Sequence, residues 1–253
     1  TRTEYQEILG GIRKTSKNQR ALLNNIVEKY NEYPKLGSTI ESELGISSST
    51  LRAAEKKGWL LKKEQEIYRN PLKDFESNAS KHSVRLNSEQ LDALNSIGTS
   101  IKEKEAKTFL LEGITGSGKT EVYLHAISTA LEQKRNALML VPEISLTPQM
   151  VKQVKERFGD NVAVLHSGLS EGEKYDEWRR IRRGEAQVVV GARSAIFAPL
   201  KNIGLILIDE EHESSYKQND TPRYHARDVA LLRSNFHNCP VVLGSATPSL
   251  ASR

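Results

Sequence analysis

Residues 109–124 read FLLEGITGSGKTEVYL, and this stretch decides the fold. Residues 113–120 within it match G-x-x-x-x-G-K-[ST], the pattern of a phosphate-binding loop. An apolar run leads directly into the loop, and a helical pattern leads directly out of it. The glycines let backbone N–H groups turn inward around phosphates, and the N-terminus of the following helix adds partial positive charge. The stretch therefore predicts a strand, a phosphate-binding loop and a helix in that order.

The side chains of this loop predict ATP and Mg²⁺ as cofactors. Lys119 would reach the β- and γ-phosphates, and the Thr120 hydroxyl would ligate Mg²⁺. The residues expected to contact the nucleotide are Gly113, Thr115, Gly116, Ser117, Gly118, Lys119 and Thr120.

Two acidic residues follow a second apolar run, residues 205–208. In a doubly wound sheet the carboxyl ends of the strands face the ligand crevice, so this run would bring its acids beside the phosphate loop. Asp209 would then hold Mg²⁺, and Glu210 would orient and deprotonate the attacking water. We expect Glu210 and Lys119 to be the catalytic residues.

Short apolar runs alternate with helical patterns from Leu86 onward, as in an α/β domain with a mainly parallel sheet. The runs are mostly free of charge, as expected for strands covered on both faces. The expected strands are residues 108–111, 137–141, 162–165, 187–190, 205–208 and 241–243. The expected helices lie near residues 120–133, 146–158, 171–183 and 225–234.

The N-terminal part has a different pattern, three short helices followed by a hairpin, which resembles a winged helix-turn-helix. We expect the helices at residues 18–30, 38–44 and 50–57. The third would be the recognition helix, and its basic residues would contact DNA phosphates. Those residues are Arg52, Lys56 and Lys57, with Lys62 and Lys63 in the hairpin. A helical protein-interaction module is the alternative.

Composition supports this division. The formal net charge is +5, and residues 1–85 hold 16 Lys and Arg against 11 Asp and Glu, whereas residues 86–253 hold 21 of each. A basic bias confined to one domain indicates a polyanionic partner such as nucleic acid. The expected parts are an N-terminal segment (1–16), a winged-helix domain (17–70), a linker (71–85) and a phosphate-loop domain (86–253).

The chain has one cysteine, Cys239, so it cannot form an internal disulfide. It has no apolar run near the ~20 residues that cross a bilayer and no secretory signal at its start. These features predict a cytoplasmic protein without a membrane partner.

The end of the chain narrows the class of nucleotide-binding protein. Residues 244–248 read Gly-Ser-Ala-Thr-Pro, and residues 209–212 read Asp-Glu-Glu-His. Together with the phosphate loop they resemble the motifs of superfamily 2 helicases, whose first motor lobe is RecA-like. The resemblance implies that Ser245, Thr247 and His212 couple the nucleotide to the grip on nucleic acid. A P-loop kinase would have no use for these residues.

Other segments resemble one family within that superfamily, the primosomal replication-restart (PriA) helicases. Residues 86–90 are similar to its opening motif, which implies that Gln90 contacts adenine. Residues 138–149, 165–170 and 191–199 are similar to further segments, and residues 213–228 resemble its aromatic-rich loop, although Pro222 stands where many relatives have tryptophan. The DNA contacts implied by the resemblance are Arg193, Tyr216, Lys217, Arg223, Tyr224 and Arg227.

The resemblance implies an ATP-dependent 3′-to-5′ DNA helicase that acts on branched and single-stranded DNA at stalled forks, with primosome and single-strand-binding proteins as partners. The family's second motor lobe, its arginine finger and its zinc-binding cysteines have no counterpart in this sequence. We therefore expect a fragment that hydrolyses ATP slowly alone, with zinc only in the missing C-terminal part. The alternatives are a double-strand DNA translocase of the RecG type and a nucleotide-switched DNA-binding adaptor.

Overall fold

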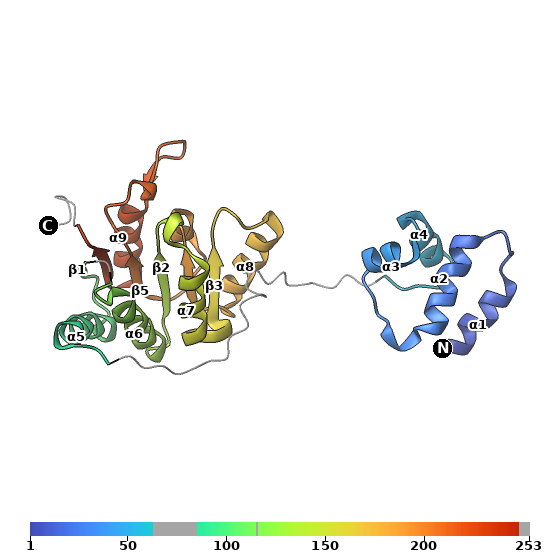
Figure 1. Ribbon diagram of the computed structural model, residues 1–253, viewed down its shortest axis with the longest axis horizontal. Helices are drawn as coiled ribbons and strands as arrows, with labels where there is room; N and C mark the ends of the chain where they lie inside the picture. The colour runs from blue at the N-terminus through green and yellow to red at the C-terminus, as the bar shows by residue number, and fades with distance from the viewer. Residues whose placement is uncertain (63–84, 115, 248–253) are drawn as a thin grey trace. The chain divides into compact units, whose positions relative to one another are not determined.

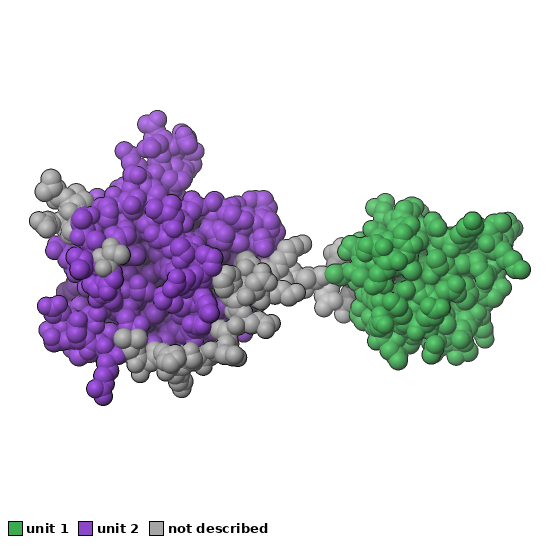
Figure 2. Space-filling model, in the orientation of Figure 1, with its two compact units in different colours: residues 1–67 green, residues 68–253 purple. Residues whose placement is uncertain are grey.

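The computed structural model describes residues 1–62, 85–114 and 116–247 (Figure 1). The chain divides into two compact units, Thr1–Ile67 and Tyr68–Arg253 (Figure 2). Among the described helices, none combines the length and the apolar character that a membrane span requires.

The first unit is a bundle of short helices. Its elements are α1 (Arg2–Gly11), α2 (Lys17–Glu28), the 3₁₀ turn η1 (Tyr30–Glu32), α3 (Gly37–Leu44) and α4 (Ser48–Lys56). Leu22, Leu23 and Ile26 of α2 form the centre of its core, where Ile40 and Ala54 meet them. The three predicted helices are thus found within two residues of their expected bounds.

Helix α1 corrects the boundary expected at residue 17. Thr1 caps it in a reciprocal capping box with Glu4. Its side chains at positions 5, 8, 9 and 12 pack against the core of the first unit. These positions have the i, i+3, i+4, i+7 spacing of a buried helical face, so residues 1–16 belong to the helical unit and not to a separate segment.

The hairpin expected after α4 stays a prediction. Residues 59–62 are assigned no strand, and its second expected strand, residues 66–68, lies outside the described residues, as do Lys63 and positions 71–84 of the expected linker. Trp59 and Leu60 pack against the core instead, and the Tyr5 hydroxyl donates to the Trp59 carbonyl over 2.7 Å.

The second unit contains a six-stranded sheet in which all strands are parallel, in the order β1-β8-β5-β2-β4-β3. The strands are β1 (Thr108–Glu112), β2 (Asn136–Leu140), β3 (Val162–Leu165), β4 (Val188–Gly191), β5 (Ile203–Ile208) and β8 (Val241–Ser245). The predicted α/β class with a mainly parallel sheet is confirmed. Because the strands are parallel, the loops that follow all six leave the sheet at one edge.

Helices cover both faces of this sheet (Figure 1). In β2, Ala137 and Met139 point to one core and Leu138 and Leu140 to the other, as the two-residue period of a strand requires. The first core contains residues of α5 (Ser88–Glu103), α6 (Lys119–Glu132) and α7 (Pro148–Phe158). The second contains residues of α8 (Glu171–Arg183), α9 (Ala226–His237) and the 3₁₀ turn η4 (Arg193–Phe197).

Short elements complete the second unit. They are the 3₁₀ turns η2 (Glu143–Ser145), η3 (Gly159–Asn161) and η5 (Ser214–Tyr216), and the two-residue strands β6 (Lys217–Gln218) and β7 (Tyr224–His225). β6 and β7 pair as an antiparallel hairpin that projects from the end of α9 in Figure 1. The four predicted helices are present, and α5 is an additional helix that the strand–helix alternation did not predict.

The free edge of β3 is covered by side chains of α8. The buried carboxylate of Glu177 accepts a hydrogen bond from the Val164 backbone N–H over 3.0 Å, and it pairs with Arg180 at 2.9 Å. Arg180 also donates to the carbonyls of Asp160 and Val162. An exposed strand edge offers unpaired backbone groups to other chains, and these two side chains occupy such groups on β3.

We expect Glu177→Ala to destabilise the second unit by about 3 kcal/mol, because it removes one partner of a buried ion pair. Urea unfolding followed by circular dichroism measures this change. Glu171→Ala on the same helix is the control, since the Glu171 side chain is 92% exposed. Equal stabilities of the two variants would contradict the role assigned to Glu177.

Candidate nucleotide and nucleic-acid site

The predicted phosphate loop connects β1 to α6. Gly116 and Gly118 have φ angles of +82° and +86°, which residues with a side chain rarely adopt. Gly118 also caps α6. The Lys119 ammonium reaches back across the loop and donates to the Gly113 carbonyl over 2.5 Å. Thr115 lies outside the described residues. The described part of the loop thus has the left-handed turns and the inward lysine of a phosphate-binding loop.

Gln90 lies against this loop. Its amide nitrogen donates to the Ser117 carbonyl over 2.9 Å, and its amide oxygen accepts from the Asn87 N–H at the cap of α5. The φ of +86° at Gly118 favours glycine, and a Cβ there would also displace the Gln90 amide, since it would lie 2.4 Å from the amide nitrogen. Both polar atoms of the Gln90 side chain thus fasten α5 to the loop. The contact of Gln90 with adenine stays a prediction.

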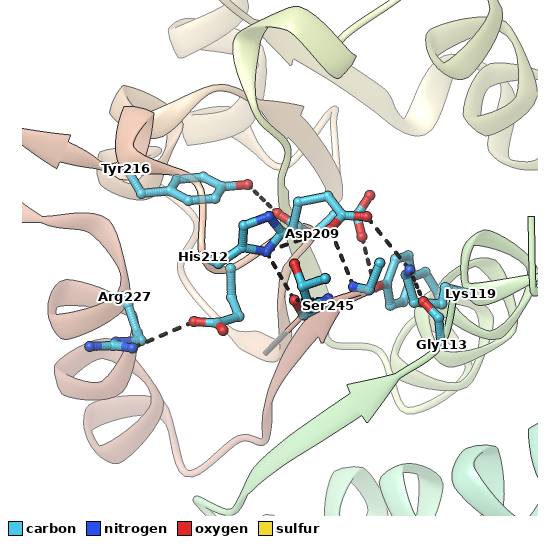
Figure 3. Close-up of polar contacts among 12 residues, drawn as sticks. Gly113, Lys119, Asp209, His212, Tyr216, Arg227 and Ser245 are labelled. Atoms are coloured by element: carbon cyan, nitrogen blue, oxygen red, sulfur yellow. Dashed lines mark hydrogen bonds and ion pairs between the residues drawn. The ribbon is translucent and has the colours of Figure 1, made fainter. Parts of the chain in front are cut away.

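The two predicted acids directly follow β5, and Figure 3 shows Asp209 near Lys119 of the loop. A Glu210 oxygen lies 3.5 Å from the Lys119 ammonium. The other oxygen accepts from the Ala246 N–H over 3.4 Å, beyond the end of β8. Glu210 has a φ of +45°, an uncommon conformation for a residue with a side chain. The carboxylate therefore contacts the phosphate loop and the Ser-Ala-Thr segment at once.

Asp209 is held deeper in the site. The buried Tyr123 hydroxyl of α6 donates to its carboxylate over 2.9 Å. Burial raises the pKa of Asp209, the Tyr123 hydrogen bond opposes that rise, and the neighbouring Glu210 adds to it. Carboxylate and hydroxyl oxygens are the ligands that Mg²⁺ prefers, and Thr120 begins the helix that carries Tyr123. Asp209 and Thr120 carry oxygens of this kind, and their binding of Mg²⁺ stays a prediction.

The three predicted coupling residues meet at the end of β8, where Figure 3 shows His212 beside Ser245. The buried Ser245 hydroxyl lies 2.9 Å from His212 Nδ1 and accepts from the Thr247 N–H over 3.1 Å. His212 Nδ1 is also 3.7 Å from a Glu210 oxygen. A hydroxyl can exchange donor and acceptor roles, so this cluster can change its hydrogen bonds as its neighbours move.

Tyr216 requires a correction. It was expected to stack on bases, but only 1% of it is exposed, and its hydroxyl donates to the Asp209 carbonyl over 2.6 Å. Burial and the nearby Asp209 carboxylate raise the pKa of Tyr216, so the phenol stays protonated and keeps donating. Tyr216 ties the aromatic-rich loop to the acidic site and cannot reach a base.

Arg193 and Arg227 are also engaged within the protein. Arg193 donates to the backbone carbonyls of Ser215 and Lys217, over 3.3 and 2.8 Å, on either side of Tyr216. Arg227 lies 3.5 Å from the buried carboxylate of Glu211. These contacts give both arginines a structural role in the loop, and their contact with DNA phosphates stays a prediction.

The remaining predicted DNA contacts of this unit gather at the β6–β7 hairpin. Lys217 and Arg223 are exposed and line a hollow of about 640 Å³ with Tyr224. Tyr224 is half-buried. Lys217 and Arg223 are accessible to a ligand, and contact of these three residues with DNA stays a prediction.

The basic residues of α4 lie in the first unit. Arg52 and Lys56 are exposed, as is Lys62 beyond the helix. Lys57 donates to Gln19 over 3.0 Å and lies 4.5 Å from the Trp59 ring. Arg52, Lys56 and Lys57 are all exposed cations of the expected recognition helix, and contact with DNA remains a prediction.

Sequence reasoning missed Tyr123, which is fully buried beneath the site and carries no motif of its own. The capping box Asn87-x-x-Gln90, by contrast, was a readable signal for α5.

Residues 83–250 match the family described as "Type III restriction enzyme, res subunit". Two relatives are named "Replication restart protein PriA". The relative from Bacillus subtilis (strain 168) is 49% identical over 96% of this chain, and the relative from Chlamydia pneumoniae is 43% identical over 100% of this chain. The alignments cover only 30% and 33% of those two proteins, so the chain spans about a third of the relatives it matches.

One solved structure is similar in fold. It is described as "Structure of RecG bound to three-way DNA junction", with a TM-score of 0.51 and 26% identity. The similarity covers 67% of this chain and 22% of that chain. It agrees with the α/β architecture found for the second unit.

We expect Asp209→Asn to raise the melting temperature at pH 7.5 by a few degrees in metal-free buffer. A carboxyl whose pKa is higher in the folded than in the unfolded chain destabilises the folded state when ionised, and this cost vanishes as the pH falls below the folded-state pKa. The gain should therefore shrink towards pH 4. Thermal scans across this pH range test it, with the exposed Asp220→Asn as control. A destabilised variant at pH 7.5 would contradict the assignment.

Proposed function

We propose, since the chain belongs to the family of the type III restriction enzyme res subunit, that it is the nucleotide-binding motor part of an ATP-dependent DNA helicase acting at branched replication forks. The relatives named replication restart proteins and the fold similarity to RecG on a three-way junction support a role on forked DNA.

The observation that carries this proposal is the position of Glu210. Its carboxylate stands 3.5 Å from the phosphate-loop lysine and accepts a hydrogen bond from Ala246 of the Ser-Ala-Thr segment. A structural acid at a strand exit would need neither contact. An acid between the phosphate loop and a second motif suits a residue that acts on the nucleotide and reports to another site.

In the proposed reaction each residue has a distinct task. Lys119 binds the β- and γ-phosphates of ATP, and Glu210 orients the attacking water and accepts its proton. Asp209 and Thr120 would hold Mg²⁺, which neutralises the charge that develops on the phosphate oxygens. Tyr123 fixes the Asp209 carboxylate through its 2.9 Å hydrogen bond.

We further propose that the aromatic-rich loop transmits DNA binding to this site. Tyr216 contacts the backbone of Asp209, and Arg193 grips the carbonyls on both sides of Tyr216. If DNA binding shifts the loop, the shift would therefore also move Asp209, the residue expected to hold Mg²⁺. The Ser245–His212–Glu210 cluster offers a second connection.

Finer features are carried over from the resemblance to the replication-restart family. They are the 3′-to-5′ direction, branched and single-stranded DNA as ligands, DNA binding by the winged helix of the first unit, and primosome and single-strand-binding proteins as partners. The exposed Arg52 and Lys56 support the DNA-binding role of the first unit.

A fork-directed double-strand translocase is the second candidate, favoured by the fold similarity to RecG. Such an enzyme shares the nucleotide motifs, so strand-displacement polarity must separate the two. A nucleotide-switched adaptor would bind ATP without needing Glu210 beside Lys119.

We expect Glu210→Gln to lower ATP turnover in the presence of forked DNA by about 10²–10⁴-fold, because the amide cannot accept the proton. Nucleotide binding should persist, whereas Lys119→Ala should weaken it. Phosphate release and a fluorescent ATP analogue measure the two effects, with exposed Lys201→Ala as the matched control. Unchanged turnover in Glu210→Gln would favour the adaptor.

A further inference from the structure

Phe197 is an exposed aromatic residue at the edge of the sheet where the nucleotide loops emerge. It ends η4, the turn that follows β4, and 47% of it is exposed. Its neighbours Ile196 and Ala198 are exposed by 0% and 1%. A large apolar ring that stays in solvent between two fully buried residues is held there by the fold.

Arg233 of α9 fixes the backbone on both sides of that ring. Its guanidinium donates to the Ile196 carbonyl and, over 3.0 Å, to the Ala198 carbonyl. The carbonyls of the residues before and after Phe197 are thus pinned to a helix of the second core. A ring presented on a fixed backbone loses little conformational freedom when it binds a ligand, which favours its use as a binding contact.

Tyr224 of the β6–β7 hairpin packs against Phe197. The two ring centres are 5.0 Å apart at an interplanar angle of 73°, an edge-to-face contact. The guanidinium carbon of Arg193 lies 5.8 Å from the centre of the Tyr224 ring. Tyr224 in turn lines the hollow that contains the exposed cations Lys217 and Arg223. An exposed ring and a basic hollow therefore adjoin each other across one tyrosine.

We propose that Phe197 is a base-stacking contact for single-stranded nucleic acid, with Lys217 and Arg223 on the phosphates of neighbouring nucleotides. This inference rests on the proposed function and names one of its DNA contacts. Sequence-tolerant single-strand sites combine an aromatic platform with cations that follow the backbone, and both parts are present here. The hollow is lined by two exposed cations and one carboxylate, that of Asp228, and this positive balance favours a polyanion over an apolar protein segment.

The correction at Tyr216 strengthens the assignment. The tyrosine expected to stack is buried, and Tyr224 is half-covered, so Phe197 is the most exposed of these three rings. Tyr224 contacts Phe197 edge-to-face, and Phe197 keeps enough exposed area for a base to reach it.

The test is the affinity of the whole chain for a fluorescein-labelled oligo(dT), measured by anisotropy at constant salt. Phe197→Ala should weaken binding by about 5–150-fold, the range of one lost base stack. Phe197→Tyr should restore nearly all of the affinity, and Phe197→Leu should not. Phe236→Ala is the matched control, because Phe236 is 82% exposed on the last turn of α9, towards the opposite edge of the sheet.

A second measurement does not depend on the alanine variant. Oligo(dT) should quench the fluorescence of the tryptophan introduced by Phe197→Trp, beyond any change that Trp59 and Trp178 give in the wild type. Absence of this extra quenching would overturn the stacking contact.

The remaining outcomes separate the two levels of proposal. Wild-type affinity in Phe197→Ala, or full restoration by Phe197→Leu, would overturn the stacking role while DNA binding and the proposed function stand. A wild-type chain that binds neither oligo(dT) nor forked DNA would overturn both.

Discussion

The lack of a side chain at Gly244 is the constraint on which the site depends. A Cβ there would lie 1.6 Å from the Tyr123 hydroxyl and 3.2 Å from an Asp209 oxygen. Only glycine lets α6 approach β5 and β8 closely enough for Tyr123 to reach Asp209. The Gly244 carbonyl accepts from the Glu211 N–H, and the next residue, Ser245, accepts from the N–H of Gly113. The close approach at Gly244 and these two backbone hydrogen bonds thus hold the ends of β1, β5 and β8 together.

The contacts around this point form two connected halves. Glu210 and Asp209 face the phosphate loop and its Lys119, and Tyr216 joins the Asp209 backbone to the aromatic-rich loop. Asp209 therefore serves both halves, through its carboxylate on one side and its carbonyl on the other. Coupling of two sites requires an element whose state both can bias, and the segment that follows β5 has that position.

Local patterns predicted the strands, the phosphate loop and the acids at the end of β5, because those depend on spacing within short stretches. The sequence did not reveal that Tyr216 is buried or that Arg193 grips backbone carbonyls, since these depend on how separate loops pack together. Exposed Phe197 was equally hidden, because its environment comes from Arg233 on a distant helix. Helix α1, by contrast, could have been predicted from the spacing of its apolar residues, and this local pattern was overlooked.

The most direct test of coupling is linkage between the two ligands. The dissociation constant of a fluorescent ATP analogue with Mg²⁺ would be measured with and without saturating single-stranded DNA, in the wild type and in Tyr216→Phe, which removes only the hydroxyl that holds the Asp209 carbonyl. In the wild type, DNA should change nucleotide affinity by about 5–150-fold, and most of that effect should vanish in the variant. Independent binding in the wild type, or undiminished coupling in Tyr216→Phe, would contradict a connection through Tyr216 and Asp209.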